Sequence, residues 1–267
     1  YTGMIGMHGT KTSNFGVAEC DLLIVAGARF SDRVVGDSSR FAKNAKILQL
    51  DVDPAEINKN IHTTASVIGD LKVILRRLNA RLDSMNHEEW IAHIDRMRDM
   101  YPLRYNKEQL TGPYIMEKIY ELTDGEAIIT TDVGQHQMWA AQYYKYKEPR
   151  TFLSSGGLGT MGFDLGAAIG AKIGAPQREV CLFVGDGGFQ MNLQELGTIF
   201  QSRVPVKIIL LNNSFLGMVR QWQELFFDKR YSFTEMTNPD FGAIAQGNGI
   251  AYRCVEKRDE LETAIHA

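Results

Sequence analysis

The hydrophobic positions change their period along the first third of the chain. Short apolar runs bounded by glycine, proline or acidic residues predict buried parallel strands at residues 21–27, 46–53 and 66–70. Between positions 71 and 82, leucine and isoleucine recur every three to four residues, which predicts an amphipathic helix. Strands that alternate with helices in this way indicate a doubly wound α/β unit over residues 1–84.

A more polar stretch separates this unit from a second α/β pattern. Residues 85–111 combine an amphipathic helical pattern with a connection through Pro102, and long connections of this kind mark domain boundaries. From residue 112 onward, Pro113 at the first turn opens a helix, and a small-residue helix is expected at 164–175. Four further strands are expected at 127–131, 151–154, 179–184 and 206–211. We therefore predict an α/β protein with two doubly wound parallel sheets, in domains 1–84 and 112–267, joined by a helical linker.

Composition narrows the classes of partner. The 267 residues are 44% hydrophobic and 23% charged, which is ordinary for a globular protein. The net charge of −3 is spread without a basic stripe, so nucleic acid is not expected as a partner. No apolar run reaches the roughly 18 residues of a membrane helix. Cys20, Cys181 and Cys254 are too far apart for a disulfide framework, which favours a reducing compartment and a cytoplasmic location.

The two ends of the chain suggest a piece of a longer protein. The sequence begins at Tyr1 and runs directly into a glycine-rich segment, without a recognisable leader. It stops at Ala267, inside a helical pattern. We expect the first domain to be truncated at its start and the second at its end.

Polar residues follow two of the strongest predicted strands. Residues 185–188 read Gly-Asp-Gly-Gly after one strand, and Asn212 and Asn213 follow the next. Because neighbouring parallel strands end at the same edge, Asp186 and Asn213 are expected to lie together, and carboxylate and amide oxygens suit Mg²⁺. The glycines let backbone N–H groups approach a phosphate. Each motif alone fits a plain turn or a helix cap better, but together they predict a magnesium–diphosphate site.

A second glycine pattern supports a competing hypothesis. Residues 157–162 satisfy the GxGxxG pattern of dinucleotide-binding folds, and Asp186 would then bind a ribose, as in an NAD-dependent dehydrogenase. Two features argue against it. Asp186 is embedded between glycines, and the strand before the pattern contains Ser154 and Ser155 and is poorly apolar.

Several longer segments carry a resemblance to a known family. The spacing from Gly-Asp-Gly to Asn-Asn resembles the thiamine diphosphate motif. Residues 134–142, 153–163 and 216–223 resemble the catalytic (large) subunit of the acetolactate synthase family, also called acetohydroxyacid synthase. In the first domain, residues 6–10, 27–30 and 51–57 resemble that family's FAD-binding middle domain. The resemblance covers essentially the whole chain.

The resemblance implies a reaction and a cofactor site. It implies decarboxylative condensation of two 2-ketoacids, pyruvate with pyruvate to 2-acetolactate and CO2 or with 2-ketobutyrate as acceptor, in branched-chain amino acid biosynthesis. The implied Mg²⁺ ligands are Asp186, Asn213 and the main-chain oxygen of Phe215. The implied thiamine diphosphate site comprises Gly134, Gln135, His136, Gly159, Met161, Gly185, Asp186, Gly187, Gly188, Asn213, Phe215, Gly217 and Met218.

Three residues have more specific implied roles. Met161 supports the bent cofactor, and its flexible thioether suits an irregular gap, although core packing would also explain it. Gly159 offers its main-chain oxygen to the aminopyrimidine ring. Trp222 lines the substrate pocket, and the simpler explanation is a core aromatic on a helix face.

The resemblance also implies a flavin that is structural, because the net reaction transfers no hydride. Its implied residues are Gly6, Met7, His8, Gly9, Gly27, Arg29, Asp32, Arg33, Asp51, Asp53 and Asp70. A mobile loop and a solvated turn are the alternatives for these segments. The sequence departs from the family pattern at Ser31, Asp164 and Phe215, which puts substrate contacts and the flavin in doubt.

The family also implies an assembly and a missing group. It forms homodimers or homotetramers and pairs with a regulatory small subunit. Its proton-shifting Glu comes from an N-terminal domain, and no acidic residue of this chain matches it, so the fragment alone is expected to be inactive. Another thiamine diphosphate-dependent decarboxylase or oxidase, and a non-enzymatic binding paralogue, remain as alternatives.

Overall fold

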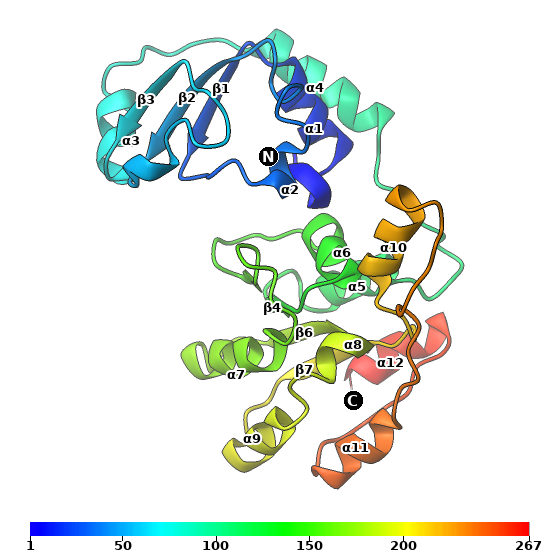
Figure 1. The fold of residues 1–267 in the computed structure, drawn as a ribbon. Helices are drawn as coiled ribbons and strands as arrows, with labels where there is room; N and C mark the ends of the chain where they lie inside the picture. The colour runs from blue at the N-terminus through cyan, green and yellow to red at the C-terminus, as the bar shows by residue number, and fades with distance from the viewer. Residues whose placement is uncertain (267) are drawn as a thin grey trace. The chain divides into compact units, whose positions relative to one another are not determined.

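The computed structural model describes residues 1–266. The chain divides into two compact units, Tyr1–Leu103 and Arg104 onward, each considered by itself below (Figure 1). Both units are built around a parallel sheet, so the expected α/β class is confirmed.

The first unit contains a three-stranded parallel sheet. Its order is β1 (Leu22–Ala26), β2 (Lys46–Asp51) and β3 (Ala65–Ile68). These bounds fall within the three runs predicted from the sequence, to within one residue. Its helices are α1 (Lys11–Glu19), α2 (Asp32–Val35), α3 (Leu71–Asn79) and α4 (Glu88–Met100), with short 3-10 turns η1 (Gly6–His8) and η2 (Pro54–Glu56).

The burial of this sheet is uneven. Val25 and Ile47 lie in a small core with Phe30, Ala42 and Ile61. By contrast, β3 is exposed at all four positions, and Leu22 and Ile24 of β1 are about half exposed. The expectation of a buried strand at 66–70 is therefore wrong, because β3 is an edge strand and all four of its residues are exposed within the described part of the chain.

The helix expected in the linker packs onto the first unit. Helix α4 contacts α1, and a Cβ on Gly16 would lie 3.0 Å from Cδ1 of Ile94. His93 Nε2 lies 2.7 Å from Glu19 Oε2, in the same α1–α4 contact. The compact first unit accordingly extends through Leu103.

The second unit contains a four-stranded parallel sheet in the order β5-β4-β6-β7. The strands are β4 (Ile128–Thr131), β5 (Phe152–Ser154), β6 (Val180–Gly185) and β7 (Lys207–Leu211). The helices are α5 (Gly112–Leu122), α6 (Gln135–Tyr143), α7 (Asp164–Gly174), α8 (Asp186–Phe189), α9 (Glu195–Ser202), α10 (Gly217–Phe226), α11 (Phe241–Gly247) and α12 (Leu261–His266), with the 3-10 turn η3 (Arg258–Glu260) before α12. Pro113 stands in the first turn of α5, as predicted.

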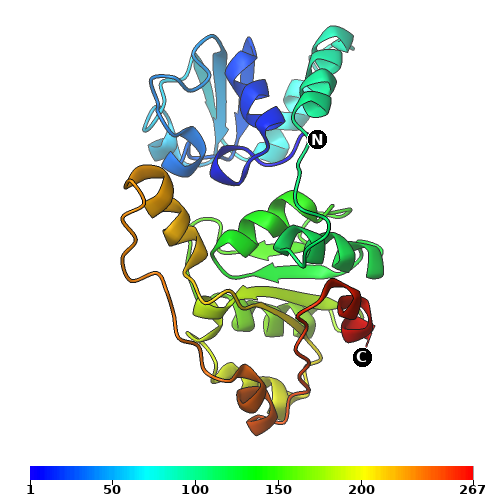
Figure 2. The same ribbon diagram turned by 90° about the vertical axis from the view of Figure 1, so that its right-hand side faces the viewer.

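Both faces of this sheet are buried. Leu182 and Val184 of β6 point into a core shared with α7, α9 and α11. Their neighbours Cys181 and Phe183 point into the opposite core, shared with α5, α6 and α12. Figures 1 and 2 show α5 and α6 on one side of the sheet and α7 and α9 on the other. Alternation along a single strand therefore supplies two cores.

Helix α10 and the chain that leads from it to α11 run outside these layers, as the orange ribbon in Figures 1 and 2 shows. No residue of α10 is buried. None of the helices within residues 1–266 is long and apolar enough to cross a membrane.

Candidate functional site

The strand order of the second unit determines where a ligand site is expected. The chain passes from β4 to β5 on one side and then to β6 on the other, so the order reverses between β4 and β6. In open α/β sheets, ligands bind outside the carboxyl ends of the strands at such a switch point. The segments that follow β4, β6 and β7 meet at this edge.

A cavity lies at this switch point. Its volume is about 110 Å³. It is lined by Val133, Gly134, Gln135, His136, Trp139, Met161, Gly185, Asp186, Gly187, Gly188, Leu211, Asn213, Phe215, Leu216, Gly217, Met218 and Val219. The structure thus brings together every residue of the predicted thiamine diphosphate set except Gly159.

Asp186 links two sides of this cavity. It directly follows β6 and is 1% exposed. Its Oδ1 accepts a hydrogen bond from Gly187 N at 3.0 Å, and its Oδ2 accepts one from Ser214 N at 2.6 Å. Next to Ser214, Asn213 Oδ1 accepts from Phe215 N at 3.0 Å. The three predicted metal-ligating residues therefore lie in two turns that are hydrogen-bonded to each other.

Asn238 is a part of this arrangement that the sequence analysis missed. Its Nδ2 donates to Asp186 Oδ2 and to Asn212 Oδ1, both at 2.7 Å. Gln190 Nε2 donates to Asn238 Oδ1 at 3.1 Å, which sets the orientation of the amide. Asn238 lies far along the chain, after α10, so no local pattern could have connected it with Asp186.

Three helices begin at the cavity without a side-chain cap, namely α6, α10 and the four-residue α8. Helix α6 begins after Gly134, and α10 begins after Leu216, and neither residue caps its helix. By contrast, Thr111 caps α5 and Asp240 caps α11 with a side-chain oxygen. The first N–H groups of an uncapped helix can bind an external acceptor, and the helix dipole favours an anion there.

Glycine lets neighbouring side chains approach closely where these turns meet. A Cβ on Gly187 would lie 2.6 Å from Leu216 Cδ2, and one on Gly217 would lie 2.4 Å from Gln135 Oε1. Between α6 and α10, Gln135 Nε2 also donates to Gln221 Oε1 at 2.9 Å. A larger residue at either glycine would displace the side chain that now approaches it.

His136 lies beneath the cavity as a neutral ring. It is 6% exposed, and burial lowers the pKa of its imidazole to about 4, while a hydrogen bond to the main chain of Asp132 opposes the shift. Its Nε2 has no hydrogen-bond partner within residues 1–266. Near neutral pH this nitrogen is therefore available to a ligand without adding a charge.

The three residues with specific implied roles lie in different surroundings. Met161 lines the cavity and is partly buried. Gly159 is exposed in the turn after β5, with φ of +67°, and does not line the cavity. Trp222 is half-buried on α10 and packs on Phe226, with ring centroids 5.0 Å apart, and does not line the cavity either.

In the first unit, the implied flavin residues gather at two places. Gly27, Asp53 and Asp70 follow β1, β2 and β3 at the carboxyl edge of that sheet, and Asp51 ends β2. Asp53 and Asp70 also cap η2 and α3, accepting hydrogen bonds from Ala55 N and Val73 N.

The glycine-rich start forms a separate cluster with α2. A Cβ on Gly6 would lie 2.4 Å from the carbonyl oxygen of Arg33, so only glycine fits there. His8 is partly buried, and burial lowers the pKa of its ring. Asp32 and Arg33 are exposed, with Oδ2 and Nη1 3.9 Å apart.

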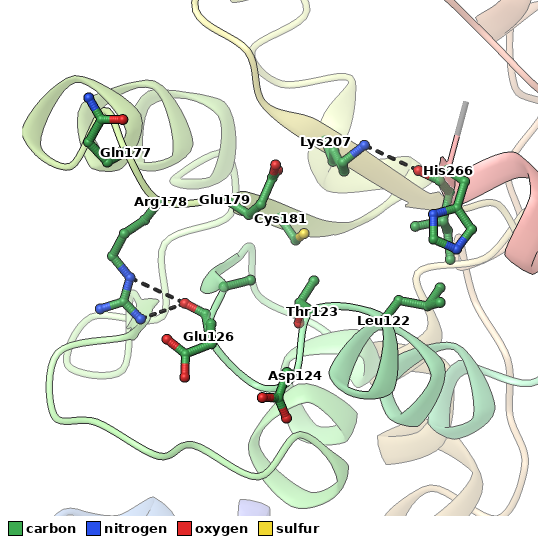
Figure 3. Close-up of a pocket in the computed structure, with 12 residues that line it drawn as sticks. Leu122, Thr123, Asp124, Glu126, Gln177, Arg178, Glu179, Cys181, Lys207 and His266 are labelled. Carbon is green, nitrogen blue, oxygen red and sulfur yellow. Dashed lines mark hydrogen bonds between the residues drawn. The ribbon is translucent and has the colours of Figure 1, made fainter.

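A larger cavity of about 580 Å³ opens at the opposite edge of the second sheet. It lies at the amino ends of β4, β6 and β7, and Figure 3 shows Arg178, Lys207 and Cys181 among its lining residues. Arg178 and Lys207 donate to main-chain oxygens of Glu126 and Ile265. Burial raises the pKa of the Cys181 thiol to about 12, so it is not a nucleophile. The cationic side chains of this cavity, Arg178 and Lys207, are therefore hydrogen-bonded within the protein.

Comparison with known proteins agrees with the position of the cavity. The sequence matches the family described as "Thiamine pyrophosphate enzyme, C-terminal TPP binding domain" over residues 132–267. It also matches "Thiamine pyrophosphate enzyme, central domain" over residues 1–78.

Curated relatives are similar over nearly the whole chain. The acetolactate synthase isozyme 2 large subunit of Escherichia coli (strain K12) is 46% identical over 99% of this chain and 48% of its own length. Acetolactate synthase of Mycobacterium leprae is 44% identical over 99% of this chain and 45% of its own length. Acetolactate synthase 1, chloroplastic, of Oryza sativa subsp. japonica is 45% identical over 98% of this chain and 43% of its own length. The chain thus spans about half the length of these relatives, and it belongs to the thiamine pyrophosphate enzyme family.

Proposed function

We propose that the natural protein is an acetolactate synthase, which condenses two 2-ketoacids with loss of CO2. The curated relatives named above carry this activity in their names. The observation that carries the proposal is the convergence of the uncapped N-termini of α6 and α10 and the Asp186 carboxylate on one cavity. A diphosphate with a hard divalent cation needs this combination of N–H donors and oxygen ligands.

The residues present fit thiamine diphosphate and Mg²⁺. Asp186, Asn213 and the main-chain oxygen of Phe215 would hold Mg²⁺, while the glycine turns and His136 would bind the diphosphate. The unpartnered Nε2 of His136 supports this assignment, because buried polar atoms rarely lack a partner. When bound, thiamine diphosphate supplies the electron sink that decarboxylation of a 2-ketoacid requires.

The remaining proposed roles belong to Met161, Trp222 and the main chain of Gly159. Met161 would support the organic part of the cofactor, and its position in the cavity lining supports this role. Trp222 would contact the second ketoacid from α10, and Gly159 would approach the aminopyrimidine from its exposed turn. Both would need a shift of their segment toward the cavity.

The first unit is proposed to bind FAD in a structural role. Gly27, Asp53 and Asp70 at the carboxyl edge of the sheet support this proposal, since that edge is where α/β sheets bind nucleotides. The carboxylates of Asp53 and Asp70 already cap η2 and α3. We therefore expect them to position the backbone as well as contact the flavin.

The proposed partners are further protein chains and 2-ketoacids. Several relatives are named large subunits, and we propose homo-oligomers of this protein together with a regulatory small subunit. Three free cysteines suit a reducing compartment, and the cytoplasm remains the proposed location.

The test uses the natural full-length protein and two aspartate variants. Asp186→Asn should lower the Mg²⁺-dependent affinity for thiamine diphosphate by at least a hundredfold and abolish acetolactate formation from pyruvate. Asp240→Asn, which keeps an N-cap on α11 in the same unit, is the matched control and should leave both unchanged. Unaltered cofactor affinity in Asp186→Asn would contradict the metal assignment.

Product analysis separates the competing functions. Acetaldehyde or an oxidised acetyl product in place of acetolactate would indicate another decarboxylase or an oxidase. Cofactor binding without turnover of any 2-ketoacid would indicate a binding paralogue, and saturable binding of NADH would favour a dehydrogenase.

A further inference from the structure

Asp132 is a buried carboxylate directly after β4, outside the predicted site. It is fully buried, and its backbone N–H donates to the carbonyl oxygen of Phe183 on the neighbouring strand at 3.4 Å. It stands immediately before Val133 and Gly134, which line the cavity. The side chain is therefore beneath the cavity, at the switch point of the sheet.

One carboxylate oxygen holds the loop that carries Met161. Asp132 Oδ1 accepts a hydrogen bond from Gly162 N at 2.7 Å. The carbonyl oxygen of Gly162 accepts a hydrogen bond from Asn192 Nδ2. The backbone of Gly162 adopts φ of +84°, and a Cβ there would meet Asn192. The residue after Met161 is thus held from both sides.

The other carboxylate oxygen faces the Gly-Asp-Gly-Gly turn. A Cβ placed on Gly188 would lie only 1.6 Å from Asp132 Oδ2. A larger residue at position 188 would therefore displace the Asp132 carboxylate from its hydrogen-bonded position. Three segments that border the cavity therefore meet at one carboxylate: the turn after β4, the Met161 loop and the turn after β6.

Stability alone does not explain this residue. Asp132 Oδ2 has no hydrogen-bond partner within residues 1–266, and burial raises the pKa of the carboxyl group. A buried carboxyl with an unsatisfied oxygen costs folding free energy. A carboxyl group that bears this cost and contacts two loops of a ligand site fits a role in positioning those loops.

We infer that Asp132 is a positioning residue that sets the distance between the Met161 loop and the Gly187–Gly188 turn, and thereby the fit of the cofactor. It acts through Gly162 and Gly188 and touches no ligand itself. The inference rests on the proposed function, since it assumes that thiamine diphosphate occupies the cavity. Groups that orient a ligand-binding residue typically change affinity by ten- to a hundredfold when removed.

The first experiment measures cofactor affinity in the full-length protein at fixed Mg²⁺. Thiamine diphosphate is titrated, and tryptophan fluorescence is followed because Trp139 lines the cavity. Asp132→Ala and Asp132→Ser, which cannot reach the Gly162 N–H, should each raise the dissociation constant at least tenfold. Asp132→Asn, which retains an acceptor oxygen, should stay within about threefold of wild type.

Asp164→Asn is the matched control. Asp164 is also fully buried and its Oδ2 likewise has no partner within residues 1–266, but its Oδ1 accepts from Leu165 N in its own helix and not from a loop that lines the cavity. This variant should bind the cofactor within twofold of wild type. A merely structural role of buried carboxylates would instead predict similar losses in both positions.

The second experiment tests the contact without a ligand. Gly188→Ala should lower the melting temperature strongly in the wild-type background. Combined with Asp132→Ala it should lower the melting temperature much less, because the added methyl group would then lie about 3.4 Å from the Cβ of residue 132. Equal losses in both backgrounds would overturn the contact.

The outcomes separate the two proposals. If Asp186→Asn abolishes cofactor binding while Asp132→Ala and Asp132→Ser bind within twofold of wild type, the positioning role is wrong and the proposed function stands. If wild type does not bind thiamine diphosphate, the proposed function and this inference both fail.

Discussion

The sheets of the two units differ in how they are covered. Strands β1 and β6 both appear in the sequence as continuous apolar runs, yet Leu22 of β1 is 52% exposed and Leu182 of β6 is fully buried. Helices cover both faces of the second sheet, whereas β3 of the first sheet is exposed throughout. An apolar run therefore predicts a parallel strand but not the layers that bury it.

The polar residues at the carboxyl edges of the two sheets differ in the range of their hydrogen bonds. In the second unit, Asp186, Asn213 and Asn238 converge through long-range hydrogen bonds on one cavity. In the first unit, Asp53 and Asp70 accept hydrogen bonds from residues two and three positions away. Both edges carry ligand-type side chains, and long-range contacts assemble the site at the second edge.

The largest expected effect compares a leucine in the edge strand β1 with a leucine in the interior strand β6. Leu182→Ala should lower the free energy of unfolding of the second unit by about 2–5 kcal/mol, because it leaves a cavity between two packed layers. Leu22→Ala in the first unit should cost less than about 1 kcal/mol, since its side chain is half exposed. Urea denaturation of each variant measures both values. Equal costs would show that β1 is covered in solution.

The pH dependence of stability probes the buried titratable groups near the carboxyl edge of the second sheet. Burial raises the pKa of Asp164 to about 6, so its stabilising contribution is complete below its ordinary value of 3.8 and is lost as the pH rises through about 6. His136 has the opposite behaviour: its contribution is present above 6.5 and is lost as the pH falls through about 4. Each shift corresponds to about 3 kcal/mol, and the two trends oppose each other.

Single variants reveal the two trends separately. In Asp164→Asn, the free energy of unfolding should fall relative to wild type as the pH is lowered from 6.5 to 4, because the Asp164 contribution is removed while His136 and Asp132, whose pKa burial also raises, still titrate. In His136→Gln it should rise over the same range. Chemical denaturation at several pH values measures both, and parallel curves for the two variants would contradict the assignment.

Helix caps should give similar effects in both units. Asp70→Ala and Asp240→Ala each remove a side chain that accepts a backbone N–H, from Val73 and Ala243. Each should cost about 1 kcal/mol. Asp70→Asn should restore the cap, so a loss of FAD binding in Asp70→Asn with unchanged stability would assign the carboxylate itself to the flavin.

The smallest effect is expected at the amino edge of the second sheet. Arg178 and Glu148 form an ion pair at 2.7 Å, and Arg178 lines the larger cavity shown in Figure 3. Glu148→Gln should change the free energy of unfolding by less than about 1 kcal/mol, because exposed pairs are screened by solvent. A change beyond 2 kcal/mol would show that this edge is more than a solvated surface.

Much of the candidate site could be predicted from local sequence. Asp186 and Asn213 follow neighbouring strands, so the rules of parallel sheets bring them to one edge. The roles of Gly159 and Trp222 are implied by the family resemblance of residues 153–163 and 216–223, and neither residue lines the cavity, because no local rule sets how a turn or an outlying helix sits on the sheet. Asn238 and Asp132 were missed because their significance depends on partners far away along the chain.

The strands, their parallel arrangement and the residue types at their ends follow from local sequence, because hydrophobic period and glycine placement act over a few residues. Which strands are buried and which polar groups share a cavity depends on the packing of the whole fold. This packing brings Gly188 against Asp132 and Asn238 against Asp186. Such contacts depend on how layers and loops pack, and packing is a property of the whole unit rather than of any one segment.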